Sequence, residues 1–329
     1  MNKNLIMKKL MKIKKIKFID IIVLNNKIIV GGDEKGDILL FELDNLNSNG
    51  KFILSKKAHD KELIALDNFK NIKNKFVTCD KNDIRIWTLK QNENNNYNIE
   101  CGIKLINFSK SEFTHLYVLN YNNNISFINS ANQVFILNMQ YKPFFKRKYE
   151  TKKLNALYQI ESNDENNSLF IIGGRSLIII YKNIEDEKNI TCLGSIRIDT
   201  FSAKSLCYLG NDLLLIGGIN NIYIANIKTI KIEQIIRVAS AECTCFFKYN
   251  DMILCGYGDI SFCHLWSNGI AQEKNTKFMV IKKNEDNYEN HYIEEAFYNF
   301  GITNALLLDK GKFISCFYDN DCLKIFQVK

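Results

Sequence analysis

Hydrophobic and polar residues alternate along this chain in short runs, and the same order of runs returns at a nearly constant interval. Each unit has an alternating segment, a strongly apolar segment, a tight turn of Gly, Asn or Asp, and a second alternating segment that ends on a large residue. The clearest unit ends with Lys75 to Trp87, and another with Lys27 to Phe41. Alternation with period two is the pattern of half-buried strands. The pattern predicts β-hairpins, because Gly, Asn and Asp supply the positive φ of tight turns.

Five further copies of this hairpin follow along the chain. They run from Ile125 to Leu137, Phe170 to Tyr181, Leu213 to Ala225, Met252 to Trp266 and Phe313 to Phe326. From Phe41 through Trp87 to Phe326, successive closing residues are 46, 50, 44, 44, 41 and 60 residues apart. A four-stranded β-propeller blade takes about 40–45 residues. The spacing therefore predicts seven blades, with extra residues before the last closing position.

A further strand-like segment separates each hairpin from the next unit. These segments are Lys51 to Ser55, Asn98 to Phe108, Phe144 to Tyr149, Ile190 to Ile198, Ile232 to Val238 and Lys277 to Lys282. Each unit then has four antiparallel strands, as a propeller blade requires. We therefore predict an all-β fold in which residues 1–329 form one seven-bladed β-propeller. Six or eight blades are the alternatives, since the third unit is the faintest.

The two ends of the sequence complement each other in this count. The seventh unit stops at Phe326, before an outer fourth strand. A surplus apolar segment, Leu5 to Met11, precedes the opening strand of the first unit, Lys17 to Val23. An N-terminal strand that completes the last blade would close the ring and leave no unpaired edge at the closure. We expect the ring to be closed in this way.

The second unit carries four residues whose chemistry fits together. His59 precedes its first strand, Thr78 lies in its second, Asp80 in the following turn, and Trp87 ends its third. A buried indole N–H and a buried imidazole both need hydrogen-bond partners.

This set resembles the hydrogen-bonded tetrad of the WD40-repeat family, whose blades place the same residue types in the same order. The resemblance covers nearly the whole chain, by spacing more than by identity. Phe41, Tyr181 and Phe326 stand where the family has Trp, and no unit has the Trp-Asp pair. The resemblance implies a degenerate WD40 β-propeller, a fold that most often serves as a platform for other proteins.

The sequence contains no motif for catalysis or nucleotide binding. It has no Gly-x4-Gly-Lys-Ser/Thr loop and no Gly-x-Ser-x-Gly elbow. The best metal candidate is a group around the sixth unit, made of Cys243, Cys245, Cys255, Cys263 and His264. Zinc sites usually draw on Cys-x2–4-Cys pairs, which this group lacks. We interpret these cysteines as small buried hydrophobic residues and expect no catalytic residue, metal or cofactor.

Residues 284–300 form an insertion between the sixth and seventh units. Aromatic residues alternate there with acidic ones, and the centre is compatible with a short helix. The aromatic residues are Tyr288, Tyr292, Phe297, Tyr298 and Phe300. Aromatic-rich loops often contain interface hot spots, so this is a candidate partner-binding segment. Packing of the same rings back onto the propeller is an equal alternative.

A second candidate surface is basic. Lys146, Arg147 and Lys148 follow Pro143 in the outer strand of the third unit. Pro and Lys commonly protect the edge strands of sheets, which is the simpler interpretation. Contact with an acidic partner or with RNA is the alternative.

The net charge of +8 does not by itself indicate nucleic-acid binding. The chain has 39 Lys and only 5 Arg beside 43 Asn, and Arg makes the bidentate contacts that phosphate and guanine favour. Ten cysteines without a secretory signal indicate a reducing compartment, and no apolar run approaches the ~20 residues of a membrane span.

From these features we expect a cytoplasmic or nuclear protein with neither a membrane nor a small-molecule partner. The predicted function is a non-catalytic protein-interaction scaffold, a subunit of a larger multi-protein assembly. The alternative is an RNA-associated propeller in ribosome biogenesis or RNA processing.

Overall fold

The structure is a computed structural model in which every regular element of the described residues is a β-strand. It describes residues 7–14, 18–25, 27–43, 51–106, 111–119, 123–150, 153–160, 168–183, 190–199, 203–249, 252–259, 278–284, 287–292, 302–309, 312–317 and 322–328. For residues 7–14, 18, 238–241, 247, 249, 252 and 257–328 the description covers the backbone only. The strands form six antiparallel sheets, five of which have four strands. The all-β prediction is therefore confirmed, and the four-stranded sheets match the predicted blades.

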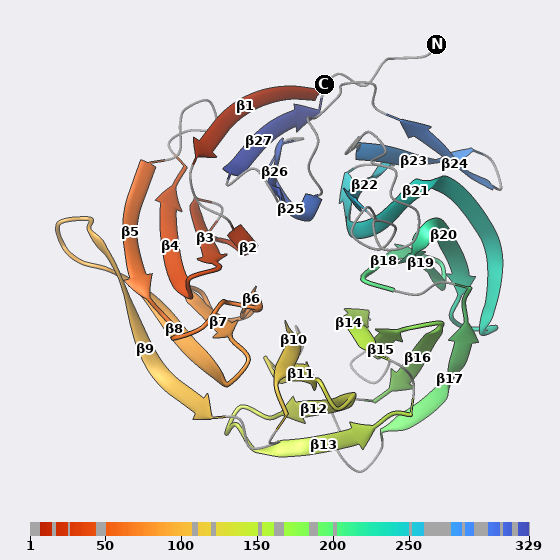
Figure 1. The fold of residues 1–329 in the computed structure, drawn as a ribbon, viewed down its shortest axis with the longest axis horizontal. Helices are drawn as coiled ribbons and strands as arrows, with labels where there is room; N and C mark the ends of the chain where they lie inside the picture. The colour runs from red at the N-terminus through yellow and green to blue at the C-terminus, as the bar shows by residue number, and fades with distance from the viewer. Residues whose placement is uncertain are drawn as a thin grey trace, which may run out of the picture. The chain divides into compact units, whose positions relative to one another are not determined.

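The chain divides into two compact structural units, which are larger than the repeats of the sequence. The first is residues 18–195, and the second is residues 1–17 with 196–329. The first unit contains four sheets, each built from four consecutive strands (Figure 1). Their strands are β2 (Phe18–Leu24), β3 (Ile28–Asp33), β4 (Asp37–Glu42) and β5 (Lys51–Lys57); β6 (Ala65–Asn68), β7 (Lys75–Cys79), β8 (Asp83–Gln91) and β9 (Tyr97–Ile106); β10 (Phe113–Val118), β11 (Ile125–Asn129), β12 (Gln133–Leu137) and β13 (Pro143–Lys148); and β14 (Leu154–Ile160), β15 (Leu169–Gly174), β16 (Leu177–Lys182) and β17 (Thr191–Arg197).

In each of these four sheets the second and third strands pair with the same register. Each residue that closes a predicted hairpin lies opposite a residue at the start of the second strand. The four pairs are Phe41 with Ile29, Trp87 with Phe76, Leu137 with Ile125, and Tyr181 with Phe170. The repeat recognised in the sequence therefore corresponds to equivalent positions in successive sheets.

Side-chain oxygens hold the tight turns between these strands. Asp33 Oδ1 accepts hydrogen bonds from the backbone N–H groups of Lys35 and Asp37, at 2.9 and 2.8 Å. Asp80 and Asn129 hold the corresponding turns of the next two sheets in the same way. Asp and Asn suit this position because their short side chains reach backbone amides two residues on.

Two glycines of the first sheet let the next one approach. A Cβ on Gly32 would lie 2.7 Å from Cδ1 of Leu63, in the segment that leads into β6. Gly36 has φ of +82°, and a Cβ there would overlap the carbonyl oxygens of Lys61 and His59. Larger residues at these positions would push the two sheets apart.

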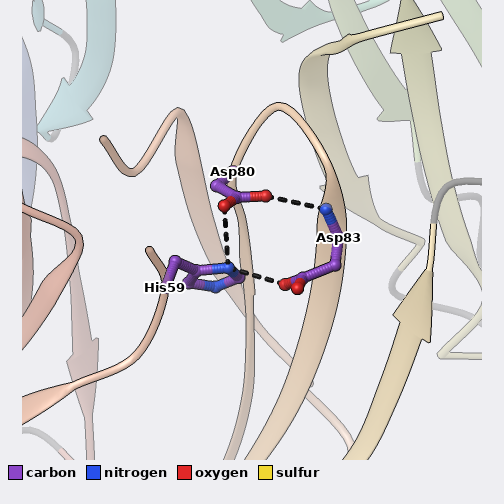
Figure 2. Close-up of side chains that lie close together, drawn as sticks. All are labelled: His59, Asp80 and Asp83. Carbon is purple, nitrogen blue, oxygen red and sulfur yellow. Dashed lines mark hydrogen bonds and ion pairs between the residues drawn. The ribbon is translucent and has the colours of Figure 1, made fainter. Parts of the chain in front are cut away.

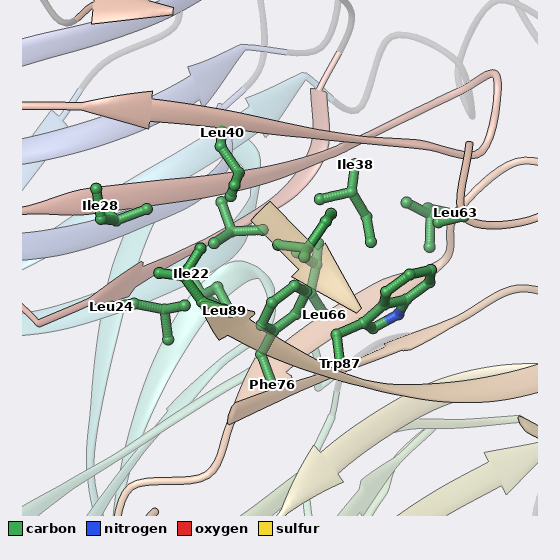
Figure 3. Packing of buried hydrophobic residues seen from close by; sticks show 13 residues of the cluster. Ile22, Leu24, Ile28, Ile38, Leu40, Leu63, Leu66, Phe76, Trp87 and Leu89 are labelled. Carbon is green, nitrogen blue, oxygen red and sulfur yellow. The ribbon is translucent and has the colours of Figure 1, made fainter. Parts of the chain in front are cut away.

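Neighbouring sheets of the first unit pack through apolar clusters. Figure 3 shows the cluster between sheets β2–β5 and β6–β9, which includes Ile22, Leu40, Leu66, Phe76 and Trp87. Similar clusters join β6–β9 to β10–β13 and β10–β13 to β14–β17. Sheets β6–β9 and β10–β13 therefore bury apolar side chains on both faces, one face against each neighbouring sheet.

The second unit contains a seven-stranded sheet and a four-stranded sheet. The strands of the larger sheet are β18 (Ser205–Gly210), β19 (Leu213–Gly217), β20 (Ile219–Asn226), β21 (Lys231–Tyr249), β22 (Met252–Asp259), β23 (Phe278–Asn284) and β24 (Asn287–Tyr292). The smaller sheet has the order β1 (Met7–Lys14), β27 (Cys322–Val328), β26 (Lys312–Phe317) and β25 (Ile302–Asp309).

The long strand β21 belongs to two sets of pairs. Its first part, Lys231 to Arg237, pairs with β20, and its second part, Ala241 to Tyr249, pairs with β22. One continuous strand therefore serves as the fourth strand of one set and the first strand of the next.

The structure corrects the predicted sixth hairpin. The strand that pairs with β22 is β23, and Ile281 lies opposite Ile253. The segment from Lys277 to Lys282 was expected as a fourth strand and proves to be the third. Ile281, rather than Trp266, therefore occupies the closing position, and the last two intervals become 56 and 45 residues. Trp266 itself lies outside the described residues.

The fourth strand of this set is β24, which pairs with β23 from Met279↔Tyr292 to Asn284↔Asn287. The first part of the predicted 284–300 insertion is thus a β-strand, and residues 293–300 lie outside the described residues. The extra residues of the sixth repeat instead lie between β22 and β23.

The N-terminal strand pairs with the C-terminal strand, as the sequence predicted. β1 runs antiparallel to β27, from Met7↔Val328 to Lys14↔Cys322. Residues from both ends of the chain therefore build one four-stranded sheet.

Candidate functional site

The densest group of ionisable side chains in the described residues surrounds His59. The chain enters this site by a turn in which the N–H groups of Ala58 and His59 both donate to the carbonyl oxygen of Gly36. This anchor directs the His59 ring toward the next sheet. The imidazole is buried, with 1% of the residue's surface exposed.

Thr78 on β7 lies between His59 and Trp87. Its Oγ1 is 2.7 Å from His59 Nε2 and accepts a hydrogen bond from Trp87 Nε1 at 2.8 Å. Thr78 and Trp87 are as buried as the histidine. One hydroxyl therefore satisfies two buried ring nitrogens, which would otherwise lack partners.

Two carboxylates face the other ring nitrogen. His59 Nδ1 lies 2.7 Å from Asp83 Oδ1 and 3.6 Å from Asp80 Oδ2 (Figure 2). The ring N–H is not aligned for a hydrogen bond with either oxygen, so the attraction is mainly electrostatic. Because Nδ1 faces two acceptors, it carries the proton of the ring.

The structure brings His59, Thr78, Asp80 and Trp87 together and adds Asp83, which the sequence reasoning missed. Asp80 mainly holds the turn, since its Oδ1 accepts from the N–H groups of Asn82 and Asp83 at 2.7 Å each. Burial acts to raise the pKa of Asp80, but the contact with His59 and these two hydrogen bonds outweigh it and lower the pKa below its usual value.

Asp83 also binds two cations. Arg85 Nε lies 3.0 Å from Asp83 Oδ1 and Nη2 lies 3.1 Å from Oδ2, and Lys104 Nζ lies 3.0 Å from Oδ2. The bidentate contact with Asp83 raises the pKa of Arg85. The carboxylate is therefore shared between a histidine, a guanidinium and an ammonium group.

His59, Asp80 and Asp83 together offer three ligand atoms within 4.8 Å of one another. A divalent cation here would compete with Arg85 and Lys104 for the Asp83 carboxylate, and a nearby cation weakens the binding of another. The chemistry fits the network of hydrogen bonds and ion pairs better than it fits a metal. The arrangement ties the His59 turn to β7 and β8.

The basic residues of the third repeat lie on β13, at the edge of sheet β10–β13. Lys146, Arg147 and Lys148 are all exposed. Lys146 Nζ lies 5.4 Å from the centre of the Phe135 ring, and Arg147 Cζ lies 5.6 Å from that of Tyr181. Two of the three cations are therefore held over buried aromatic rings.

Arg147 has an equivalent in the first sheet. Lys56 on β5 lies opposite Ile38 as Arg147 lies opposite Val134, and its Nζ is 5.9 Å from the centre of the Trp87 ring. In both cases a cation on the fourth strand covers the closing aromatic residue of the next sheet. Arg147 therefore contributes to packing between sheets as well as to surface charge.

The aromatic candidates of the 284–300 segment are only partly described. Tyr288 and Tyr292 lie on β24, opposite Lys283 and Met279. Phe297, Tyr298 and Phe300 lie outside the described residues.

The cysteine group is likewise described in part. Cys243, Cys245 and Cys255 are buried on β21 and β22, near Cys207 of β18. Burial raises the pKa of the Cys255 thiol well above its usual value, and the neighbouring thiols add to the shift. Such thiols behave as small hydrophobic residues. Cys263 and His264 lie outside the described residues.

Comparison with known proteins finds no matching family model and no matching curated protein. Within the described part of the chain, no helix is long and apolar enough to cross a membrane.

Proposed function

We propose that the chain is a degenerate WD40-type β-propeller of seven blades that holds partner proteins and carries out no catalysis. Counting β21 as two strands, the described strands fall into seven sets of four paired strands. The corrected closing position at Ile281 brings the last interval to 45 residues, which agrees with one four-stranded blade. The pairing of β1 with β27 supports a ring that is closed within the last blade.

The WD40 assignment rests on the second sheet. His59, Thr78 and Trp87 form a buried chain of hydrogen bonds, and a carboxylate from the turn faces the free side of the imidazole. This is the arrangement that the tetrad of that family implies, with Asp83 closer to the ring than Asp80.

One observation carries the scaffold proposal: the ionisable side chains around His59 are already bound to other residues of the protein. A catalytic histidine needs access to substrate and a partner that orients it. His59 is buried, its Nε2 is bound to Thr78, and Asp83 is bound to Arg85 and Lys104. The side chains best suited to acid–base chemistry thus stabilise the fold, and the exposed edges are left for partners.

Affinity capture of the intact protein under gentle conditions, followed by mass spectrometry, tests the proposal. We expect specific proteins in stoichiometric amounts, which are absent from a capture with the tag alone. Recovery of the chain as a lone monomer from native extracts would contradict the scaffold role.

An RNA-associated propeller is the second candidate, and the exposed cations of β13 are the observation that favours it. Ultraviolet crosslinking in cells should then recover RNA with the wild type. The triple variant Lys146→Glu/Arg147→Glu/Lys148→Glu should recover none. Equal crosslinking by both proteins would dismiss this candidate.

A further inference from the structure

We propose that β13 is a docking strand for an extended acidic segment of a partner protein, which adds to sheet β10–β13 as a fifth strand. The inference rests on the proposed scaffold function and names the chemistry of one partner. Three properties of β13 carry it: its free backbone groups, its unpaired charges and the fixed positions of two cations.

The backbone of β13 has hydrogen-bonding groups directed away from its sheet. The Tyr149 N–H donates to the carbonyl oxygen of Asn132, and Lys148 and Lys146 lie opposite Gln133 and Phe135. Inward and outward groups alternate along an antiparallel strand. The N–H and C=O groups of Lys146 and Lys148 therefore point outward, where a further strand would pair with them.

The charges of β13 have no acidic partner among the described residues. Within the described part of the chain, no carboxylate lies within ion-pair distance of Lys146, Arg147 or Lys148. By contrast, Lys90 pairs with Glu100 at 2.6 Å and Lys204 with Glu242 at 2.7 Å. A row of unpaired cations along an edge repels basic strands and attracts acidic ones.

The two ring contacts define how such a strand would be recognised. Because side chains alternate along a strand, Lys146 and Lys148 lie on one face and Arg147 on the other. Phe135 and Tyr181 hold Lys146 and Arg147 beside the edge, so less conformational freedom is lost on binding. The expected ligand alternates acidic residues with others, so that its acidic side chains lie on the face of Lys146 and Lys148.

A protein strand fits β13 better than RNA does. Single-stranded RNA is bound largely by stacking of bases on exposed aromatic rings. Among the rings at this edge, Phe135 is 2% exposed, Tyr181 is 1% exposed and Phe145 is 9% exposed. Phe144 and Tyr149 are partly buried against the cluster between the sheets. Outward amide and carbonyl groups, in contrast, match the backbone of a strand.

Fluorescence anisotropy with a labelled decapeptide of alternating Glu and Val residues tests the proposal. We expect binding to wild type to weaken at least tenfold in Lys146→Glu/Lys148→Glu, which keeps Arg147 over Tyr181. The control Lys228→Glu/Lys231→Glu makes the same charge change at exposed positions elsewhere and should bind within twofold of wild type. Equal binding by the β13 variant would overturn the proposal. Thermal unfolding shows whether each variant is folded, and Lys148→Glu alone provides a milder second test.

The same peptide with alternate amide nitrogens methylated keeps its charge but cannot donate to the strand edge. We expect this peptide to lose binding, and equal affinity would reduce the interaction to unspecific attraction. A fluorescent uridine decanucleotide that binds more tightly than the peptide, and is lost in the same variant, would overturn the proposal in favour of RNA. If all peptide tests fail while affinity capture still finds partners, the scaffold function stands and this surface is excluded.

Discussion

Sheets β6–β9 and β10–β13 place different chemistry at equivalent positions. Thr78 lies two residues after Phe76, which is opposite Trp87, and Phe127 lies two residues after Ile125, which is opposite Leu137. In the first sheet a hydroxyl joins two ring nitrogens. In the second, Phe127 stacks against Phe135 at 4.9 Å and meets Phe113 edge to face at 4.8 Å.

The turns between the second and third strands of the two sheets also differ in their polar side chains. Asp80 and Asp83 face a histidine. At the corresponding places Asn129 and Gln133 bond to each other, with Asn129 Nδ2 donating to Gln133 Oε1 at 2.9 Å. In the first sheet carboxylates face the imidazole of His59, and in the second a pair of neutral amides occupies the corresponding places.

The comparison indicates that the polar set is kept or replaced as a whole. A lone hydroxyl or imidazole in a buried site would leave unpaired groups, each costing about 1–3 kcal/mol. A complete apolar set has no such cost. Variants that combine part of the polar set with part of the apolar set should therefore be destabilised.

The largest effect is expected from Phe127→Thr, which places the hydroxyl of one sheet into the aromatic stack of the other. Loss of a ring that is 0% exposed should lower the free energy of unfolding by about 3–5 kcal/mol. Urea denaturation measures it. The control Phe52→Thr changes a side chain that is 51% exposed and should cost less than about 1 kcal/mol. Similar losses in the two variants would contradict the account.

Thr78→Val keeps the shape of the side chain and removes its hydroxyl. Trp87 Nε1 and His59 Nε2 then lose their partner, so we expect a loss of about 2–4 kcal/mol in the same assay. The triple variant His59→Leu/Thr78→Val/Trp87→Phe removes the whole polar set. It should lose less than the sum of its single variants, and strict additivity would argue against a coupled network. Thr114→Val, which removes a hydroxyl bonded to the Ile128 carbonyl, is the matched control.

Asp83→Asn and Asp80→Asn distinguish the contributions of the two carboxylates of the His59 site to stability. Asp83→Asn removes the charge bound to His59, Arg85 and Lys104, and should cost about 1–3 kcal/mol at pH 7. Asp80→Asn retains an oxygen for the turn and should cost less.

The pH dependence of Asp80 provides a further check. Its pKa is lowered in the folded state, so its stabilisation is present above the unfolded-state pKa and is lost as pH falls through the folded-state pKa. The difference between wild type and Asp80→Asn should therefore shrink on the acid side. A difference that grows there would contradict the assignment.

The smallest effect concerns Asp67, whose Oδ2 accepts from the Val118 N–H at 2.7 Å. Desolvation by burial raises its pKa from 3.8 to about 6. The folded state then holds a proton that the unfolded state has lost, so stability from this group falls as pH rises between those values. Asp67→Asn should flatten this slope, which is about 1 kcal/mol per pH unit at its steepest, as measured by denaturation at several pH values. An unchanged slope would exclude Asp67 as its source.

The repeat was readable from the sequence because strand alternation and turn residues are local properties. His59, Thr78 and Trp87 were also found, since their order along the chain follows the order of the strands. Asp83 was missed because the geometry of the turn, rather than spacing, decides which of two nearby carboxylates faces the imidazole.

Trp266 is a misleading signal for a physical reason as well. A Trp at nearly the expected interval resembles a closing residue, whereas strand pairing depends on long-range hydrogen bonds that spacing does not encode. Ile281 carries no such signal, because aliphatic residues occur at many positions of every strand. The corrected pairing came only from the register of β22 and β23.

The most direct test of the closed propeller is the unfolding of a chain that lacks residues 1–14, followed through Trp87. The Trp266→Phe background leaves Trp87 as the only tryptophan of the chain, and it reports on the unit of residues 18–195, whereas β1 belongs to the other unit. If one ring joins all seven blades, loss of β1 should lower the midpoint reported by Trp87 by at least about 5 °C in a single transition. An unchanged Trp87 midpoint would show that the two units unfold independently and would contradict the closed ring.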